Sequence, residues 1–255
     1  FLITERTAGQ FRIVDKDGKV SGPIKTNVPQ VMTLGQGGLL DVALDPDFAA
    51  NQMIYWSYSE PGSDGRNNTA VAKGKLVDGA TPRIDNIKVI WRQTPKVTGR
   101  GHYSHRLTFS PDGKYLFVAS GERQKMQPAQ DTGATLGKIV RLNLDGTPAA
   151  GNPMAAQGGV TAEIWSMGHR NILGIDWDAQ GRLWEVEHGP AGGDELNLVE
   201  PGKNYGWPLV SFGQNYNGTP IPNHDTRPDL AMPVLYWVPV IAPGNLMFYR
   251  GTQTF

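Results

Sequence analysis

Arg106-Leu107-Thr108-Phe109-Ser110-Pro111-Asp112-Gly113, followed by Tyr115-Leu116-Phe117-Val118-Ala119, is the stretch that decides the fold. Its first half is an apolar run, and its second half is rich in the aromatic and β-branched residues that favour strands. Asp112-Gly113 between them is a strong signal for a tight hairpin turn. The stretch therefore predicts two antiparallel strands joined by an acidic turn.

The same unit occurs twice more, each time as an apolar strand, an acidic turn and a second, aromatic-rich strand. Pro46 and Pro111 lie 65 positions apart, and Gly113 and Gly181 lie 68 positions apart. A β unit repeating at this spacing is typical of propeller blades with long inserted loops, whereas a two-sheet sandwich would show shorter and more even strand spacing. The two further copies are residues 39–47 leading into 53–58, and residues 172–178 with Gly181 leading into 182–186.

At this period the chain holds about four blades. Residues 11–18 fit another hairpin of the same kind, and residues 246–251 have the pattern of a fresh strand. We therefore expect an all-β fold, with a single β-propeller domain over residues 1–255. We also expect the complete ring to be larger, with its C-terminal part missing from this chain.

Composition excludes several classes of protein. The 24 basic and 24 acidic residues give a net charge of zero, so no basic excess points to a nucleic-acid partner. The absence of cysteine excludes disulfides and thiolate metal sites, and no apolar run is long enough to span a bilayer. The 32 glycines and 19 prolines favour a β-rich chain with many turns. No signal peptide is visible, but residues 1–5 resemble the inside of a strand, so secretion stays open.

The stretch Gly189-Pro190-Ala191-Gly192-Gly193-Asp194-Glu195 lies between two apolar runs, residues 183–186 and 196–199. This order predicts a strand, a tight loop and another strand. Because the loop carries little side-chain bulk, its backbone carbonyls can approach a ligand or a hard cation closely. Its oxygen-rich composition is of the kind that calcium prefers. Taken alone, however, the loop is better interpreted as a glycine-rich hairpin with two solvated acids.

Polar residues occur at the same point of three successive repeats, just ahead of the first strand. Gln36 precedes one such strand, His102 and His105 the next, and Arg170-Asn171 the one after. The loops that enter the innermost strands lie at the mouth of a propeller's channel, where these proteins bind ligands. A histidine there is suited to act as a general base near neutral pH. An arginine offers a fixed cation with a planar fork of donors, which suits an oxyanion or a quinone carbonyl.

Each of these residues also has a simpler interpretation. His102 is then a loop histidine that bonds only its neighbours, and Arg170 forms a salt bridge between blades. A metal pair of His102 and His105 is weakly indicated, because side chains three apart in an extended chain point to opposite faces. Trp207 fits a core position better than an aromatic wall. Because the polar residues recur at one point of the repeat, the functional interpretation is favoured overall.

The chain resembles the soluble quinoprotein glucose/sorbosone dehydrogenase family, and within it the aldose sugar dehydrogenases. The resembling segments follow the family's order and span nearly the whole chain. They are residues 36–48, 101–107, 137–142, 163–171, 187–195 and 204–208.

This resemblance implies a six-bladed propeller that binds pyrroloquinoline quinone (PQQ) over a calcium ion. His102 matches the family's general base, and Arg170 the cation beside the reactive C5 carbonyl of the quinone. The cofactor-binding residues implied in the same way are Asn171, Gly189, Pro190 and Gln36. Of these, Gly189 and Pro190 match the residues whose backbone carbonyls hold the calcium, and Gln36 matches a polar residue lining the substrate site.

The implied activity is oxidation of an aldose at its anomeric carbon to a lactone, by transfer of a hydride to PQQ. The implied partners are an aldose substrate and an external electron acceptor, with no nucleic acid and no membrane span. A periplasmic or secreted location is likewise implied by the family.

One departure from the family keeps two alternatives open. The lysine and the closely spaced arginine pair that hold the PQQ carboxylates in the family have no matching segment before Phe255. A calcium-dependent propeller lactonase or other hydrolase is one alternative, although it would need carboxylate side chains facing the channel. A non-catalytic binding propeller is the other, since a fold does not fix a function.

Overall fold

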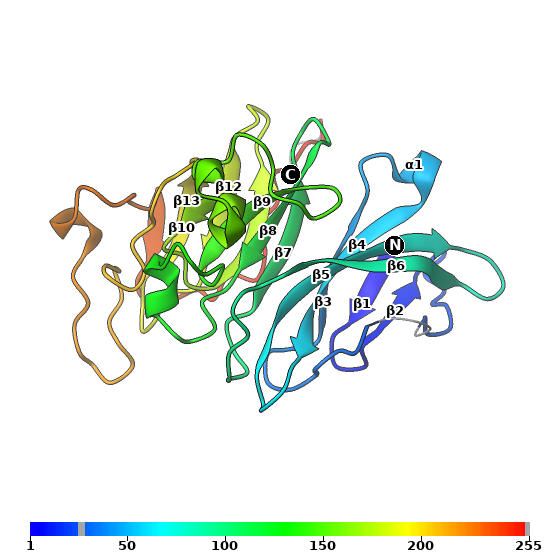
Figure 1. Ribbon diagram of the computed structural model, residues 1–255, viewed down its shortest axis with the longest axis horizontal. Helices are drawn as coiled ribbons and strands as arrows, with labels where there is room; N and C mark the ends of the chain where they lie inside the picture. Colours follow the sequence, from blue (N-terminus) through cyan, green and yellow to red (C-terminus); the bar gives the residue numbers. More distant parts are fainter. Residues whose placement is uncertain (25–28, 253–255) are drawn as a thin grey trace.

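The structure, a computed structural model, describes residues 1–24 and 29–252. These residues form three four-stranded antiparallel sheets and one two-stranded sheet, with only short helical turns between them (Figure 1). The first sheet consists of β3 (Leu39–Leu44), β4 (Met53–Pro61), β5 (Asn67–Val77) and β6 (Arg83–Arg92). The second consists of β7 (Ser104–Phe109), β8 (Tyr115–Ser120), β9 (Lys138–Asn143) and β10 (Ile164–Met167). The third consists of β11 (Ile172–Trp177), β12 (Leu183–Glu187), β13 (Asp194–Val199) and β14 (Leu235–Trp237).

The remaining elements are small. The two-stranded sheet pairs β1 (Leu2–Glu5) with β2 (Gln10–Ile13). The helical turns are α1 (Phe48–Asn51), η1 (Gln127–Gln130), η2 (Ala155–Gln157), η3 (Gly159–Glu163) and η4 (His224–Thr226). Among the described residues, no helix has the length and apolar character needed to cross a membrane.

The three large sheets are consecutive blades of a β-propeller. In each sheet the strands are ordered as in the sequence, and the first strands, β3, β7 and β11, lie next to one another. Hydrogen bonds join these neighbours: the Leu107 amide donates to Asp41 Oδ2 over 2.9 Å, and the Ile172 amide donates to Ser104 Oγ over 2.8 Å. The three hairpins predicted from the repeat are therefore confirmed, and the architecture is a partial propeller.

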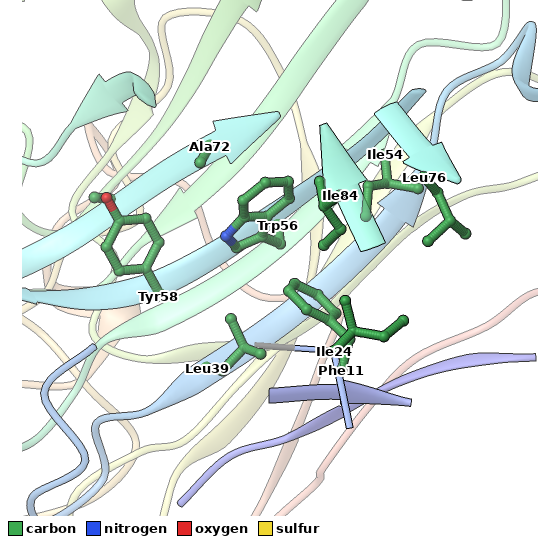
Figure 2. Packing of buried hydrophobic residues seen from close by; sticks show 10 residues of the cluster. Phe11, Ile24, Leu39, Ile54, Trp56, Tyr58, Ala72, Leu76 and Ile84 are labelled. Atoms are coloured by element: carbon green, nitrogen blue, oxygen red, sulfur yellow. The ribbon is translucent and has the colours of Figure 1, made fainter. Parts of the chain in front are cut away.

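Packing between blades follows from the alternation of side chains along each strand. In β4, Trp56 faces the two-stranded sheet, where its ring meets that of Phe11 edge to face with centroids 5.5 Å apart (Figure 2). Tyr55, its neighbour in sequence, packs instead with Leu116 of the second blade. Burial of each such side chain contributes roughly 1.5–3 kcal/mol. Alternate residues of β4 thus pack against two different neighbouring sheets. This packing keeps the ends of the blades in fixed positions relative to one another.

Two further expectations concern the ends of the chain. The 65-residue period predicts about four blades, and the described residues form four sheets, of which the one made by β1 and β2 has only two strands and is an incomplete blade. Residues 246–251 form no regular strand within the described part of the chain. That segment is nevertheless tied to the third blade, since the Phe248 amide donates to Asp176 Oδ2 over 2.8 Å. A side-chain acceptor replaces the ladder of backbone bonds that defines a strand.

The antiparallel register determines where the loops meet. Ser104, at the start of β7, pairs with Ser120 at the end of β8, and Ile172, at the start of β11, pairs with Glu187 at the end of β12. The loops that precede the first strands therefore lie beside the loops that follow the second strands. All of the site residues predicted from the sequence lie in these loops, at one end of the blades.

Candidate active site

His102 forms a buried pair with a carboxylate that follows the neighbouring strand. Its Nδ1 contacts Glu122 Oε1, and the second carboxylate oxygen of Glu122 accepts the Met126 amide over 2.6 Å. Burial alone would raise the pKa of Glu122, but the bonds from His102 and Met126 hold that pKa below its usual value. The ionised carboxylate can keep a proton on Nδ1, which leaves Nε2 of the imidazole to exchange protons with a ligand.

The backbone around His102 is held from several directions. The His102 amide donates to Gln36 Oε1 over 2.7 Å, while the His102 carbonyl accepts the Arg123 amide over 3.2 Å. His102 has a φ of 48°, a conformation that costs about 1–3 kcal/mol in a non-glycine residue. The buried guanidinium of Arg123 helps to hold this conformation by donating to the Gly101 carbonyl over 2.9 Å. The sequence reasoning missed Glu122 and Arg123, although both follow a predicted second strand at this end of the blade.

Arg170 brings a cation to the same end of the molecule. Its side chain donates to the His188 carbonyl over 2.9 Å and to the Tyr216 hydroxyl over 3.1 Å, and it lies over the Trp207 ring at 5.1 Å. Among the described residues no carboxylate forms an ion pair with it, so a salt bridge between blades is the wrong interpretation. Nε of Arg170 has no partner in the described part of the chain, although it is buried. Trp207 is buried as expected, and it is also a wall beside this cation.

Asn171 and Gln36 lie together in a cleft of about 280 Å³, with Arg6, Ser104 and His188 also in its wall. Asn171 Oδ1 accepts the Ser104 amide over 3.2 Å. His102 is not part of this wall and reaches the cleft through its bond with Gln36.

His105 lines the same cleft, and burial lowers its pKa to about 3, so its ring is neutral. Among the described residues, the one group of three or more side chains that could hold a metal ion is His169 with Glu185 and Glu187, and it contains neither His102 nor His105.

The loop between β12 and β13 is organised by Asp194. Its Oδ1 accepts the Gly189 amide over 2.9 Å, and its Oδ2 accepts the amides of Ile241 and Ala242 over 2.8 and 2.7 Å. Asp194 and Glu195 are only 1% and 6% exposed. The prediction of two solvated acids is therefore wrong. The acids face inward because each has a partner there, Asp194 in backbone amides and Glu195 in His224.

Gly189 and Pro190 present carbonyl groups that suit a hard cation. A Cβ at Gly189 would lie 2.2 Å from the Gly193 carbonyl oxygen, so only glycine fits this position. Within the described residues no hydrogen bond uses the carbonyl oxygen of Gly189 or Pro190. Both residues line a second, small cavity together with Arg170, and His188 contributes to the walls of this cavity and of the cleft. Carbonyl oxygens beside a cation-bearing wall fit calcium together with an anionic ligand.

Beneath this cavity lies a buried ionic cluster that the sequence reasoning did not identify. Nδ1 of His169 is 3.6 Å from Glu185 Oε1 and 3.8 Å from Glu187 Oε1. Burial by itself lowers the pKa of His169, but the two carboxylates raise it to about 9. Burial and the neighbouring Glu187 raise the pKa of Glu185 to about 8. The available signal was the spacing of Glu185 and Glu187, which places both on one face of a strand.

Comparison with known proteins gives a consistent result. The model of the family described as glucose/sorbosone dehydrogenase matches residues 1–255. Aldose sugar dehydrogenase YliI of Escherichia coli is 43% identical over 256 aligned residues, which cover 99% of this chain and 68% of that protein. A crystal structure of a glucose dehydrogenase superposes with a TM-score of 0.86 at 47% identity, covering 92% of this chain and 68% of the other.

A third relative was solved with its cofactor. The PQQ-bound form of an aldose sugar dehydrogenase from Streptomyces coelicolor superposes with a TM-score of 0.70 at 33% identity, covering 87% of this chain and 63% of that one. The chain thus spans about two thirds of the length of each of these relatives. Since the family model matches the whole chain and the blades carry the expected residues at one end, this protein belongs to the glucose/sorbosone dehydrogenase family.

Proposed function

We propose that this protein is an oxidoreductase that oxidises aldoses at the anomeric carbon to lactones, with PQQ as the electron acceptor. The observation that carries the proposal is the convergence of three chemical groups at one end of the blades. These groups are the His102–Glu122 pair, the cation of Arg170 and the carbonyls of Gly189 and Pro190. The relative from Streptomyces coelicolor, whose structure contains PQQ, supports the choice of cofactor.

The residues present fit part of what PQQ and calcium require. Gly189 and Pro190 would hold a calcium ion through their carbonyl oxygens, and Arg170 with Asn171 would contact the quinone. Nε of Arg170 lacks a partner within the described residues, which suits a group awaiting an anionic or carbonyl ligand. When bound, PQQ would supply a two-electron acceptor for the hydride at C1 of the sugar, and calcium would supply a Lewis acid.

The protein's own part in the reaction centres on a proton. We assign His102 Nε2 as the base that accepts the proton of the anomeric hydroxyl, because Nδ1 is already held by Glu122. The carboxylate of Glu122 then stabilises the imidazolium that forms. Arg170 stabilises negative charge that develops on the electron acceptor. Because its side chain is buried and already fixed in position, it does not have to move as this charge develops. The external electron acceptor and a location outside the cytoplasm remain predictions from the family.

The two acids of the β12–β13 loop do not favour the hydrolase alternative. A calcium-dependent lactonase needs carboxylate side chains that face the channel. Here Asp194 accepts three backbone amides, and Glu195 bonds to His224 and Asn197. A binding propeller without catalysis is the second candidate. It rests on the fold alone, because a fold does not fix a function.

A titration of the purified protein with PQQ in calcium buffer tests the proposal, with the quinone absorbance as the readout. We expect stoichiometric binding that a calcium chelator prevents, and bleaching of the oxidised band after glucose is added. Binding without bleaching by any of several aldoses would favour the binding propeller. Hydrolysis of a sugar lactone in the absence of PQQ would favour the lactonase instead.

A further inference from the structure

Glu187 makes an unusual pair of contacts with the loop that carries Arg170 and Asn171. One of its carboxylate oxygens, Oε2, accepts the backbone amide of Arg170 over 2.6 Å and that of Asn171 over 3.2 Å. Glu187 is only 3% exposed, so both bonds are formed away from water. Hydrogen bonds to an ionised acceptor are about twice as strong as neutral ones, and more so in a buried setting.

These amides depend on Glu187 because the sheet does not supply a partner for them. Regular pairing of β11 with β12 begins at Ile172, and the register shifts between Ile172 and Gly174. The amides of Arg170 and Asn171 therefore precede the backbone ladder. A buried amide without an acceptor costs about 1–3 kcal/mol, so this carboxylate decides the conformation of the loop.

Glu187 also connects the loop to the other parts of the candidate site. It is the last residue of β12, and Gly189 follows two residues later. The carbonyl of Arg170 in turn accepts the amide of Glu122, the partner of His102, over 3.0 Å. A single continuous path of hydrogen bonds thus runs from the histidine pair through Arg170 to the end of β12, just before the carbonyls of Gly189 and Pro190.

Glu185 provides the internal comparison. It lies two residues earlier on the same face of β12, belongs to the same buried cluster and faces the same ring of His169. Its Oε1 accepts Asn197 Nδ2 over 2.7 Å, and it makes no hydrogen bond to the amides of the Arg170 loop. The two carboxyl groups therefore share burial and the contact with His169, but only Glu187 accepts the amides of the Arg170 loop.

We propose that Glu187 is a positioning residue, which holds Arg170 and Asn171 against the Gly189–Pro190 loop. The cation of Arg170 and the two carbonyls of that loop can then contact the same ligand. The identity of that ligand rests on the proposed function, whereas the positioning itself does not. Glu187→Gln keeps a neutral carbonyl acceptor but removes the charge, which weakens both hydrogen bonds and lets the Arg170 loop move relative to β12.

Hydrogen exchange of individual backbone amides, followed by NMR in the protein without cofactor, tests the positioning. In the wild type we expect the amides of Arg170 and Asn171 to be protected although they lie outside the ladder. In Glu187→Gln we expect both to exchange at least tenfold faster, whereas Glu185→Gln leaves their rates within about twofold. Equal rates in the two variants would overturn the proposal. So would unprotected amides in the wild type, a result that needs no variant to fold.

Cofactor binding supplies the second readout. We expect Glu187→Gln to weaken PQQ binding in calcium buffer by about 10–100-fold, the usual effect of removing an outer-sphere partner. Glu185→Gln should bind PQQ as the wild type does, even where both variants lose thermal stability. Equal losses of affinity in the two variants would reduce Glu187 to a structural role. If the wild type binds no PQQ, the proposed function fails, and the exchange rates still decide the positioning.

Discussion

His102 and Glu122 show how much of the candidate chemistry depends on one contact. The pair is buried, and the backbone of His102 is held in a left-handed conformation that only a fixed surrounding tolerates. We expect His102→Ala to lower kcat by about 10²–10⁴-fold, the usual contribution of a general base, and to leave PQQ binding within about twofold. Steady-state kinetics with a parallel binding titration checks this. Turnover that survives the change would mean that another group takes the proton.

Glu122→Gln separates the role of the carboxylate from that of the ring. We expect kcat to fall by about tenfold or more, because the neutral amide stabilises the imidazolium less than a carboxylate does. Glu163→Gln is the matched control, since that half-buried carboxyl of the same blade bonds Trp91 Nε1 over 2.7 Å and touches none of the site. An equal fall in kcat for both variants would point to a general loss of folding rather than to the pair.

Tyr216 is exposed over 77% of its surface, yet its hydroxyl contacts the buried Arg170 over 3.1 Å. Loss of an exposed hydroxyl changes stability by less than about 0.5 kcal/mol. We therefore expect Tyr216→Phe to keep the thermal midpoint and to lower kcat/KM a few-fold, because the Arg170 side chain loses one of its two hydrogen bonds. Kinetics on two different aldoses, together with a melting curve, checks this. A change in melting temperature without a kinetic effect would contradict it.

The turn between β12 and β13 carries the most demanding steric requirement of the site. Gly189→Ala places a Cβ 2.2 Å from the Gly193 carbonyl oxygen. The atoms in its way all belong to the backbone, so the backbone itself would have to move. We expect a loss of about 2 kcal/mol of stability, and loss of calcium-dependent PQQ binding, measured by denaturation and by absorbance titration. Gly22→Ala is the control, because a Cβ there meets no atom within 4 Å. Unimpaired binding by Gly189→Ala would remove this loop from the metal site.

The hairpins were predictable because each depends on local signals, an alternating apolar run and an acidic turn. Asp112-Gly113 is one example, since Gly113 takes a φ of 71° in the turn between β7 and β8. The segment at residues 246–251 was not predictable in this way, because it is attached to residues more than 70 positions earlier: the Phe248 amide bonds Asp176 Oδ2, and the Arg250 side chain bonds the Trp177 carbonyl. Backbone pairing is short-range in a hairpin, whereas side-chain acceptors from another blade leave no local pattern.

The same distinction holds for the candidate site across the whole molecule. Gln36, Arg170 and Asn171 were identifiable because the repeat places them at equivalent points of successive blades. Glu122 and Glu187 were missed because Glu122 follows a second strand and Glu187 ends one, and only the antiparallel register brings them beside the first strand. A sequence reveals which loops share an end of the propeller, but pairs such as His102–Glu122 arise from contacts between loops.

The stability of the whole molecule is linked to pH through His169. Its ring faces Glu185 and Glu187 of β12. The ring also stacks on Tyr205 and bonds Ser166 Oγ over 2.8 Å. Its pKa of about 9 in the folded protein exceeds its ordinary value of 6.5, so the folded state binds the extra proton between these two values. The stabilisation is therefore complete below pH 6.5 and is lost as the pH rises through 9.

We expect the wild type's advantage in unfolding free energy over His169→Gln to be greatest at and below pH 6.5, and to shrink as the pH rises to 9. The decrease stays below about 3 kcal/mol, because the loss of His169 raises the pKa of Glu185 further and so makes the variant lose stability over the same range. The comparison with the variant matters because burial lowers the pKa of Lys138 to about 7, which makes stability rise with pH over part of this range. That contribution is common to both proteins and cancels in the difference. Urea denaturation at half-unit steps of pH measures it. A difference that stays constant or grows with pH would show that His169 is neutral in the folded protein and that the cluster is held by other contacts.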